Sequence, residues 1–256
     1  MIVLALGDVV SKQGCEFLME RLPALKRLKN VDLCIANGEN SASGNGILPS
    51  SAEDLFDSGV DFITTGNHVY RRKEVYDFLE ENDRIIRPAN FYNGNPGKGY
   101  NIVDMGKYQV AIINLSGNYG METADNAFLC ADKILDEVKN VKIKIVDFHA
   151  ETTSEKRALG FYLDGRVSAF FGTHTHVQTA DEQILPNKTG YITDLGMCGT
   201  IDSVLGVKKE IIIKKMIDNM PARFDAADGE CMINACLFEI DEKTGNCVSI
   251  ERLNVR

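Results

Sequence analysis

The chain has 256 residues, of which 44% are hydrophobic and 25% are charged, as in ordinary globular proteins. This composition excludes a wholly disordered chain, because enough apolar surface is present to offset the entropy lost on folding. The 28 basic and 37 acidic side chains give a net charge of −9. That charge disfavours binding to DNA or to an anionic membrane, although a local site for one phosphate stays open.

The seven cysteines are irregularly spaced and form no Cys-x-x-Cys pair. We therefore expect reduced thiols that pack as small core residues, in a cytoplasmic protein. The apolar run at the N-terminus stops at Gly7-Asp8 and has no basic flank. It predicts neither a signal peptide nor a membrane anchor.

Short apolar runs alternate with amphipathic stretches in the first part of the chain. The pattern predicts strands over 2–6, 32–36 and 61–64, each followed by a helix, over 13–28, 52–57 and 73–81. Ser50 and Glu53 have the spacing of a capping box for the helix over 52–57. This order of elements predicts a sheet with helices packed on it.

The stretch 87–107 is rich in Gly, Asn and Pro and predicts loops. Beyond it, the pattern predicts strands over 110–114, 143–148, 168–171 and 191–193, and helices over 124–138, 154–163 and 209–219. Two final strands, over 232–240 and 248–253, flank a turn sequence and predict a hairpin. Without repeats or linkers, one domain over residues 1–256 is the simplest expectation.

Polar side chains follow the predicted strands directly, and all four histidines of the chain are among them. Ligands bind at the carboxyl ends of strands in open α/β sheets, so we expect these side chains to form one site. Taken singly, each could instead be a helix cap, a turn residue or a hydrogen-bonded core group. The set comprises Asp8, Glu39, Asn40, Asn67, His68, His149, His174 and His176.

The donor atoms in this set are carboxylate oxygens, amide oxygens and imidazole nitrogens. They suit iron, manganese or zinc better than a structural zinc site built from thiolates. His174 and His176 are two residues apart, so in an extended segment both imidazoles project to the same side. The number of donors exceeds the needs of one tetrahedral ion and fits two ions that share a carboxylate.

These motifs resemble those of the calcineurin-like metallophosphoesterases. GD at 7–8, GEN at 38–40, GNH at 66–68, His149 and GTHTHV at 172–177 occur in that family's order. Within it, the chain is similar to the YmdB-like branch of 2′,3′-cyclic-nucleotide phosphodiesterases, which it also matches at 87–90, 194–197 and 202–206. The chain has Val10 where the wider superfamily has a histidine and Glu39 where it has an aspartate, as this branch does.

The resemblance implies an α/β/β/α sandwich of mixed sheets, with helices on the outer faces. It also implies two divalent or mixed-valence transition-metal ions, with iron favoured and manganese or zinc as alternatives. One ion would be held by Asp8, Glu39, Asn40 and His176, and the other by Glu39, Asn67, His149 and His174. Glu39 would bridge the two ions, and His68 would be a catalytic group that binds neither. The residues that grip the substrate stay unidentified.

The implied activity is hydrolysis of 2′,3′-cyclic nucleotides to nucleoside monophosphates. A hydroxide bridging the two metals would attack phosphorus, and His68 would protonate the leaving ribose oxygen as a general acid. Arg71-Arg72-Lys73 could attract the phosphate or form a solvated basic face. Two alternatives stay open: a phosphoesterase for a phosphomonoester or a cyclic dinucleotide, and a metal-binding regulator that binds RNA or a protein. We expect a small cyclic nucleotide as partner, with no DNA and no membrane, and leave a homo-oligomer open.

Overall fold

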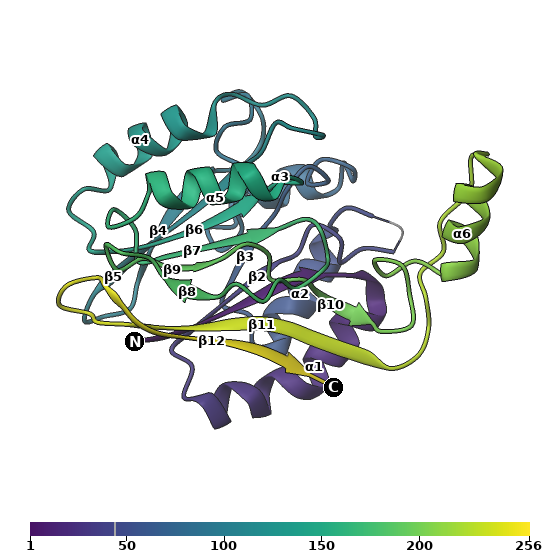
Figure 1. Cartoon of the computed structure of the whole chain (residues 1–256), viewed down its shortest axis with the longest axis horizontal. Helices are drawn as coiled ribbons and strands as arrows, with labels where there is room; N and C mark the ends of the chain where they lie inside the picture. Colours follow the sequence, from purple (N-terminus) through teal and green to yellow (C-terminus); the bar gives the residue numbers. More distant parts are fainter. Residues whose placement is uncertain (44) are drawn as a thin grey trace.

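The computed structural model describes residues 1–43 and 45–256. Its centre consists of two six-stranded sheets that face each other (Figure 1). The first sheet has the spatial order β12 (Cys247–Val255), β11 (Cys231–Ile240), β10 (Met197–Thr200), β1 (Ile2–Val9), β2 (Leu33–Asn37) and β3 (Phe62–Thr64). The second has the order β4 (Tyr100–Asp104), β5 (Gln109–Ser116), β6 (Ile143–His149), β7 (Ala169–Thr173), β9 (Gly190–Ile192) and β8 (Gln183–Ile184).

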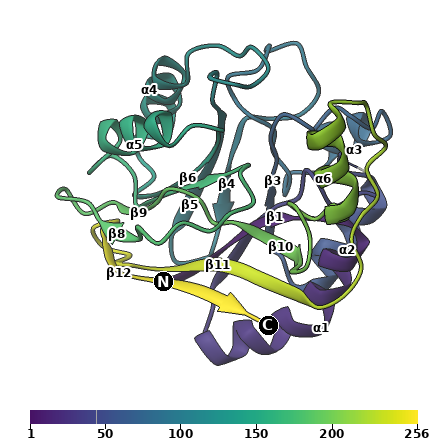
Figure 2. The ribbon, with the colours of Figure 1, turned by 45° about the vertical axis from the view of Figure 1, so that its right-hand side comes forward.

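Helices cover the outer faces of both sheets. α1 (Ser11–Lys29), α2 (Pro49–Ser58) and α3 (Val75–Glu81) follow the strands of the first sheet, and α4 (Ala127–Glu137) and α5 (Thr153–Tyr162) follow strands of the second. Figures 1 and 2 show α1 and α2 on one side of the molecule and α4 and α5 on the other. α6 (Lys209–Asp218) projects beyond the ends of the strands. The predicted α/β/β/α sandwich is therefore confirmed.

Alternation of side chains along the strands builds three apolar layers. On β1, Leu4 and Leu6 pack with the apolar faces of α1 and α2, whereas Val3 and Ala5 point into the layer between the sheets. A third layer joins the second sheet to α4 and α5 through residues such as Ile134. Because β1 is buried on both faces, its sequence is a continuous apolar run rather than an alternating one.

Strand direction brings the polar ends of the strands together. β1 is parallel to β2 and β10, and β2 is parallel to β3. In the second sheet β5, β6 and β7 are also parallel. The residues that end β1, β2, β3, β6 and β7 therefore converge at one end of the sandwich, where the candidate site lies.

The prediction of loops over 87–107 is wrong at 100–104, which form β4 on the edge of the second sheet and pair antiparallel with β5. The sequence Tyr-Asn-Ile-Val-Asp contains residues that are rare in strands, and β4 is tolerated there because one of its faces is open to solvent. β8 and β10 were also not predicted. β10 contains a glycine and lies between β1 and β11, where tertiary contacts outweigh its weak propensity.

The predicted capping box is also wrong. α2 begins at Pro49, whose fixed φ suits the first turn of a helix, and Leu48 is the N-cap residue. Ser51, not Glu53, closes the turn, since its hydroxyl accepts a hydrogen bond from the Leu48 amide at 3.0 Å.

Two further expectations are confirmed by the structure. β11 and β12 form the predicted hairpin, and all seven cysteines are free. Within the described ranges 1–43 and 45–256, no helix is long and apolar enough to cross a membrane.

Candidate active site

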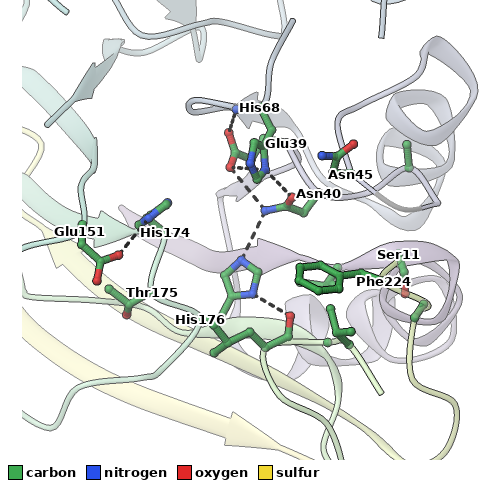
Figure 3. Close-up of a pocket in the computed structure, with 16 residues that line it drawn as sticks. Ser11, Glu39, Asn40, Asn45, His68, Glu151, His174, Thr175, His176 and Phe224 are labelled. Carbon is green, nitrogen blue, oxygen red and sulfur yellow. Dashed lines mark hydrogen bonds and ion pairs between the residues drawn. The ribbon is translucent and has the colours of Figure 1, made fainter. Parts of the chain in front are cut away.

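The polar residues at the strand ends meet around one cavity of about 310 Å³ (Figure 3). Five of the predicted residues line it: Glu39, Asn40, His68, His174 and His176. The side chains of Asp8 and His149 contact these residues, and the side chain of Asn67 contacts His149. The structure thus brings together every residue of the set that the sequence singled out.

Donor atoms converge around the buried ring of His149. Its Nε2 atom lies 3.0 Å from Asn67 Oδ1, 3.1 Å from Glu39 Oε1 and 3.1 Å from His174 Nδ1. The ligand atoms of Glu39, His149 and His174 all lie within 4.8 Å of one another. Two nitrogens and two oxygens so close together form a donor set that suits one transition-metal ion.

A second group of donor atoms lies between Asp8 and His176. His176 Nε2 lies 3.6 Å from Asp8 Oδ1 and 3.3 Å from the side-chain amide of Asn40. Asp8 is fully buried, and its Oδ1 atom has no hydrogen-bond partner among the described residues. An unpaired buried carboxylate oxygen is costly, so this atom fits a cation that would compensate it.

The nitrogens of His149 and His174 that point away from these groups have partners of their own. His149 Nδ1 lies 3.0 Å from Thr173 Oγ1, whose hydroxyl donates to Asp147 Oδ1 at 2.7 Å. Thr173 therefore accepts from His149, which places a proton on Nδ1 and leaves the Nε2 lone pair free. Glu151 Oε2 lies 3.0 Å from His174 Nε2 and leaves the Nδ1 lone pair free in the same way. Metal-binding histidines typically have such partners.

His176 has the same arrangement, with a backbone oxygen as its partner. Its Nδ1 donates to the carbonyl of Leu205 at 3.1 Å, so the Nε2 lone pair faces Asp8 and Asn40. All three predicted histidine ligands thus present a free lone pair to the group of oxygen donors around them.

The segment that carries two of these histidines has an unusual backbone. His174 and His176 have φ angles of 101° and 61°, in the region that favours glycine. Between them, the Thr175 amide donates to Asp194 Oδ2 at 3.2 Å. Asp194 in turn forms a buried ion pair of 2.6 Å with Lys156 of α5. This pair holds the segment in a conformation that turns both rings toward the cavity.

Opposite charges dominate the electrostatics of the site. Burial alone would raise the pKa of Asp8, but the nearby imidazoles of His176 and His149 and the hydrogen bond from the His174 amide lower it far below its usual value. Burial would also raise the pKa of Glu39. The charge and hydrogen bond of His149 outweigh this effect, so the pKa of Glu39 is lowered as well. Both carboxylates are therefore ionised and attract positive charge.

The pKa values of His149 and His174 shift in opposite directions. Burial would lower the pKa of His149, but the charge of Glu39 raises it to about 9. Burial and the neighbouring charge of His149 lower the pKa of His174 to about 4. Without a bound cation, a second proton on His149 Nε2 would provide the positive charge that the carboxylates attract. A bound cation would displace that proton and take the Nε2 lone pair.

His68 contacts Glu39 and Asn40, but it does not belong to the cluster of possible ligand atoms formed by Glu39, His149 and His174. Its backbone amide donates to Glu39 Oε2 at 2.8 Å, and its Nδ1 lies 2.9 Å from Asn40 Oδ1. The side chain is 27% exposed and lines the cavity. Gly66 precedes this segment because a Cβ atom there would lie 2.2 Å from the ring of His149.

The basic residues after His68 do not reach the cavity. Arg72 donates to the carbonyls of Ser43 and Asn45 at 2.6 and 3.0 Å, and Arg71 forms an ion pair of 3.0 Å with Glu122. Neither arginine lines the cavity. They hold neighbouring loops instead, so the phosphate-attracting role considered for them has no support in the structure.

Sequence reasoning missed the direct partners of the three histidines, which are Thr173, Glu151 and the carbonyl of Leu205. It also missed Asp147 behind Thr173 and the Lys156–Asp194 pair that holds the segment between His174 and His176. Two of them lie beside recognised motifs, since Glu151 is two residues after His149 and Thr173 is inside GTHTHV. Leu205 belongs to the stretch 202–206, which was recognised as similar to the YmdB-like branch. In the structure the carbonyl of Leu205 in this stretch accepts the hydrogen bond from His176.

The arrangement of sheets and helices matches solved structures over the whole chain. A structure described as a novel phosphatase from Mycoplasma pneumoniae has 33% sequence identity and a TM-score of 0.95, covering 100% of this chain and 93% of that one. The NAD nucleotidase of Haemophilus influenzae shares the fold alone, with 13% identity and a TM-score of 0.61 over 99% of this chain and 55% of that one. The fold class is that of the metallophosphoesterases.

Sequence comparison narrows the class to one family. The model of the family described as YmdB-like protein matches residues 4–253, and the chain belongs to this family. A relative from Bacillus subtilis (strain 168) is 45% identical over 254 residues, covering 99% of this chain and 96% of its own length. That relative is named 2′,3′-cyclic-nucleotide 2′-phosphodiesterase. The predicted family and enzyme class are thereby confirmed.

Proposed function

We propose that this protein is a metal-dependent phosphodiesterase that hydrolyses 2′,3′-cyclic nucleotides to nucleoside monophosphates. The observation that carries the proposal is the arrangement of His149, His174 and His176, whose free lone pairs all face the buried carboxylates Asp8 and Glu39. The substrate class follows the name of the Bacillus subtilis relative, which matches 99% of this chain.

The donor atoms divide into two sets that would hold two ions. Asn67, His149 and His174 surround one position, and Asp8, Asn40 and His176 surround the other. Glu39 is common to both, because its Oε1 atom lies 3.1 Å from His149 Nε2 and 3.4 Å from Asn40 Nδ2. A pair of divalent ions would supply water activated at neutral pH and positive charge beside the phosphate oxygens.

His68 would move the proton that the leaving oxygen requires. Rotating the side-chain amide of Asn40 by 180° exchanges its oxygen and nitrogen without changing the shape of the side chain. In that orientation Oδ1 faces His176 Nε2 and would face a bound ion. The Nδ2 group of Asn40 then donates to His68 Nδ1, which leaves the imidazole proton on Nε2. With its Nε2 hydrogen directed at the leaving oxygen, His68 would act as the general acid by donating that hydrogen bond as negative charge develops on the alkoxide.

Removal and replacement of metal tests this proposal. The protein is stripped with a chelator and then reloaded with iron, manganese or zinc, and hydrolysis of 2′,3′-cyclic AMP is followed. We expect activity to be lost on stripping and restored by at least one metal. Absence of turnover with every metal would contradict the proposal and favour a binding function. Turnover of a phosphomonoester or a cyclic dinucleotide alone would leave the enzyme class intact and overturn the substrate.

A further inference from the structure

The cavity of the candidate site has an apolar side to which neither the metal ligands nor His68 belong. The polar groups described above form one part of its lining, and another part consists of the apolar side chains of Val10, Leu205, Val207, Phe224 and Ala226. We call these five residues the apolar wall. In Figure 3, Phe224 lies on the opposite side of His176 from Glu151. A substrate whose phosphate lies at the polar end would therefore place its remaining part along the apolar wall.

Backbone contacts fix the apolar wall relative to the metal ligands. The carbonyl of Leu205 accepts the hydrogen bond from His176 Nδ1 at 3.1 Å. The segment that carries Phe224 is then joined to residues 206–208, because Ala227 N donates to Gly206 O at 2.9 Å and Lys208 N donates to Asp225 O at 3.0 Å. These backbone hydrogen bonds fix the position of Phe224 relative to residues 205–208, and Leu205 in turn contacts His176.

Close packing beneath this loop strengthens the connection. Gly206 has a φ of +90°, and a Cβ atom there would lie 2.4 Å from Val10 Cγ1. Val10 is two residues after Asp8, at the position where the wider superfamily has a histidine. In this chain an apolar side chain at that position supports the loop instead, which gives the departure from the superfamily pattern a structural role.

The ring of Phe224 is partly exposed and could stack against a planar group. It remains 41% exposed although it lines the cavity. The ammonium group of Lys215 lies 5.0 Å from the centre of the ring, and such a contact favours one orientation of the ring. An oriented and partly exposed aromatic ring beside a phosphoester site suits the flat face of a nucleobase.

We propose that Phe224 is the platform on which the nucleobase of the substrate stacks, with Leu205 and Val207 packing around it. This inference rests on the proposed function and adds the part of the site that recognises the base. Stacking accepts every base because each has a π face, so purines and pyrimidines would all be substrates. A purine covers more of the ring than a pyrimidine and would benefit more.

The experiment compares a substrate that has a base with one that lacks it. The two substrates are 2′,3′-cyclic AMP and the 2′,3′-cyclic phosphate of 1-O-methylribose. For Phe224→Ala we expect kcat/KM to fall by about 5- to 100-fold on the nucleotide, the range that loss of one base stack implies. On the abasic substrate we expect no change, since that substrate does not reach the ring.

Further variants separate stacking from a structural effect. Phe224→Trp should keep the preference for the nucleotide, and Phe224→Leu should lose most of it while still filling the apolar wall. Phe161→Ala removes another half-exposed aromatic ring, on α5, and serves as the control without effect.

Three results would overturn the inference or its basis, and they differ from one another. An equal loss on both substrates in Phe224→Ala and Phe224→Leu would make Phe224 a structural residue. No loss on either substrate would exclude a base platform at this position. If the unaltered protein hydrolyses neither cyclic phosphate, the proposed function itself fails.

Discussion

Glu39 is the residue on which the two-ion interpretation depends most. It is fully buried, and its Oε1 atom lies between His149 of one donor set and Asn40 of the other. A carboxylate shared by two cations links their affinities, because its removal takes one ligand from each.

We therefore expect Glu39→Ala to lower the occupancy of both metal sites, measured by elemental analysis of protein purified without chelator. The unaltered chain should approach two ions. Glu122→Ala, which removes an exposed carboxylate that pairs with Arg71, is the matched control and should keep both ions. Loss of one ion with native affinity at the other would show that Glu39 is not the bridge.

His68 should separate catalysis from metal binding. His68→Ala should keep both ions, yet lose about 10²- to 10⁴-fold in kcat on an ester with an alkoxide leaving group. The loss should be much smaller on an aryl ester, whose leaving group hardly needs a proton. His149→Ala is the contrasting variant and should lose metal and activity together.

Equal losses of His68→Ala on both ester types would exclude the acid role and make His68 a positioning residue. Loss of an ion in that variant would make it a ligand.

Sequence reasoning singled out the candidate donor residues, which the structure brings together, because each stands at the end of an apolar run and has a side chain suited to metals. It could not identify Asp147, Thr173 or Glu151 as their partners. A hydroxyl or carboxylate that supports a histidine has no spacing of its own, and its role arises only when separate strands meet.

At the scale of elements, α5 supports the segment that directly follows β7 and carries His174 and His176. Lys156 of α5 is fully buried and pairs with Asp194, which holds the amide of Thr175. Positive φ angles at His174 and His176 cost about 1–3 kcal/mol each and persist only where the surroundings impose them.

Lys156→Met should destabilise the fold by about 3–5 kcal/mol, because it leaves the carboxylate of Asp194 buried without a counter-charge. Adding Asp194→Asn removes that charge, so the double variant should be more stable than Lys156→Met alone. Urea unfolding of the three proteins measures the difference. A double variant that is less stable than the single one would show that the ion pair is not the source of the effect.

The elements most visible in the sequence were those with strong periodicity. Most helices, and strands such as β1 and β6, came close to their predicted ranges. β4 and β10 were missed because pairing with neighbouring strands, rather than propensity, makes them strands. α6 was correctly predicted as a helix. Its apolar residues Ile213, Met216 and Ile217 are nevertheless exposed, so the apolar pattern of this helix did not predict which of its residues are buried.

At the scale of the whole molecule, the two sheets share one apolar layer that includes Val3, Ile35, Ile112 and Ile145. This shared core supports the single domain over residues 1–256, which remains a prediction. The net charge of −9 has a functional consequence. We expect it to disfavour long RNA, whose binding needs many cationic contacts, and so to favour the small nucleotides that we propose as substrates.

The most direct test of the account is the ratio of kcat/KM between cyclic nucleotides of the two ring types. The metal-loaded protein is assayed on the four 2′,3′-cyclic nucleotides, on 3′,5′-cyclic AMP and GMP, and on a short RNA that ends in a cyclic phosphate. We expect the 2′,3′-cyclic mononucleotides to be hydrolysed fastest, with modest differences among the bases and slower turnover of the RNA. A clear preference for the 3′,5′ rings would contradict the proposed function, while the metallophosphoesterase fold and family would stand.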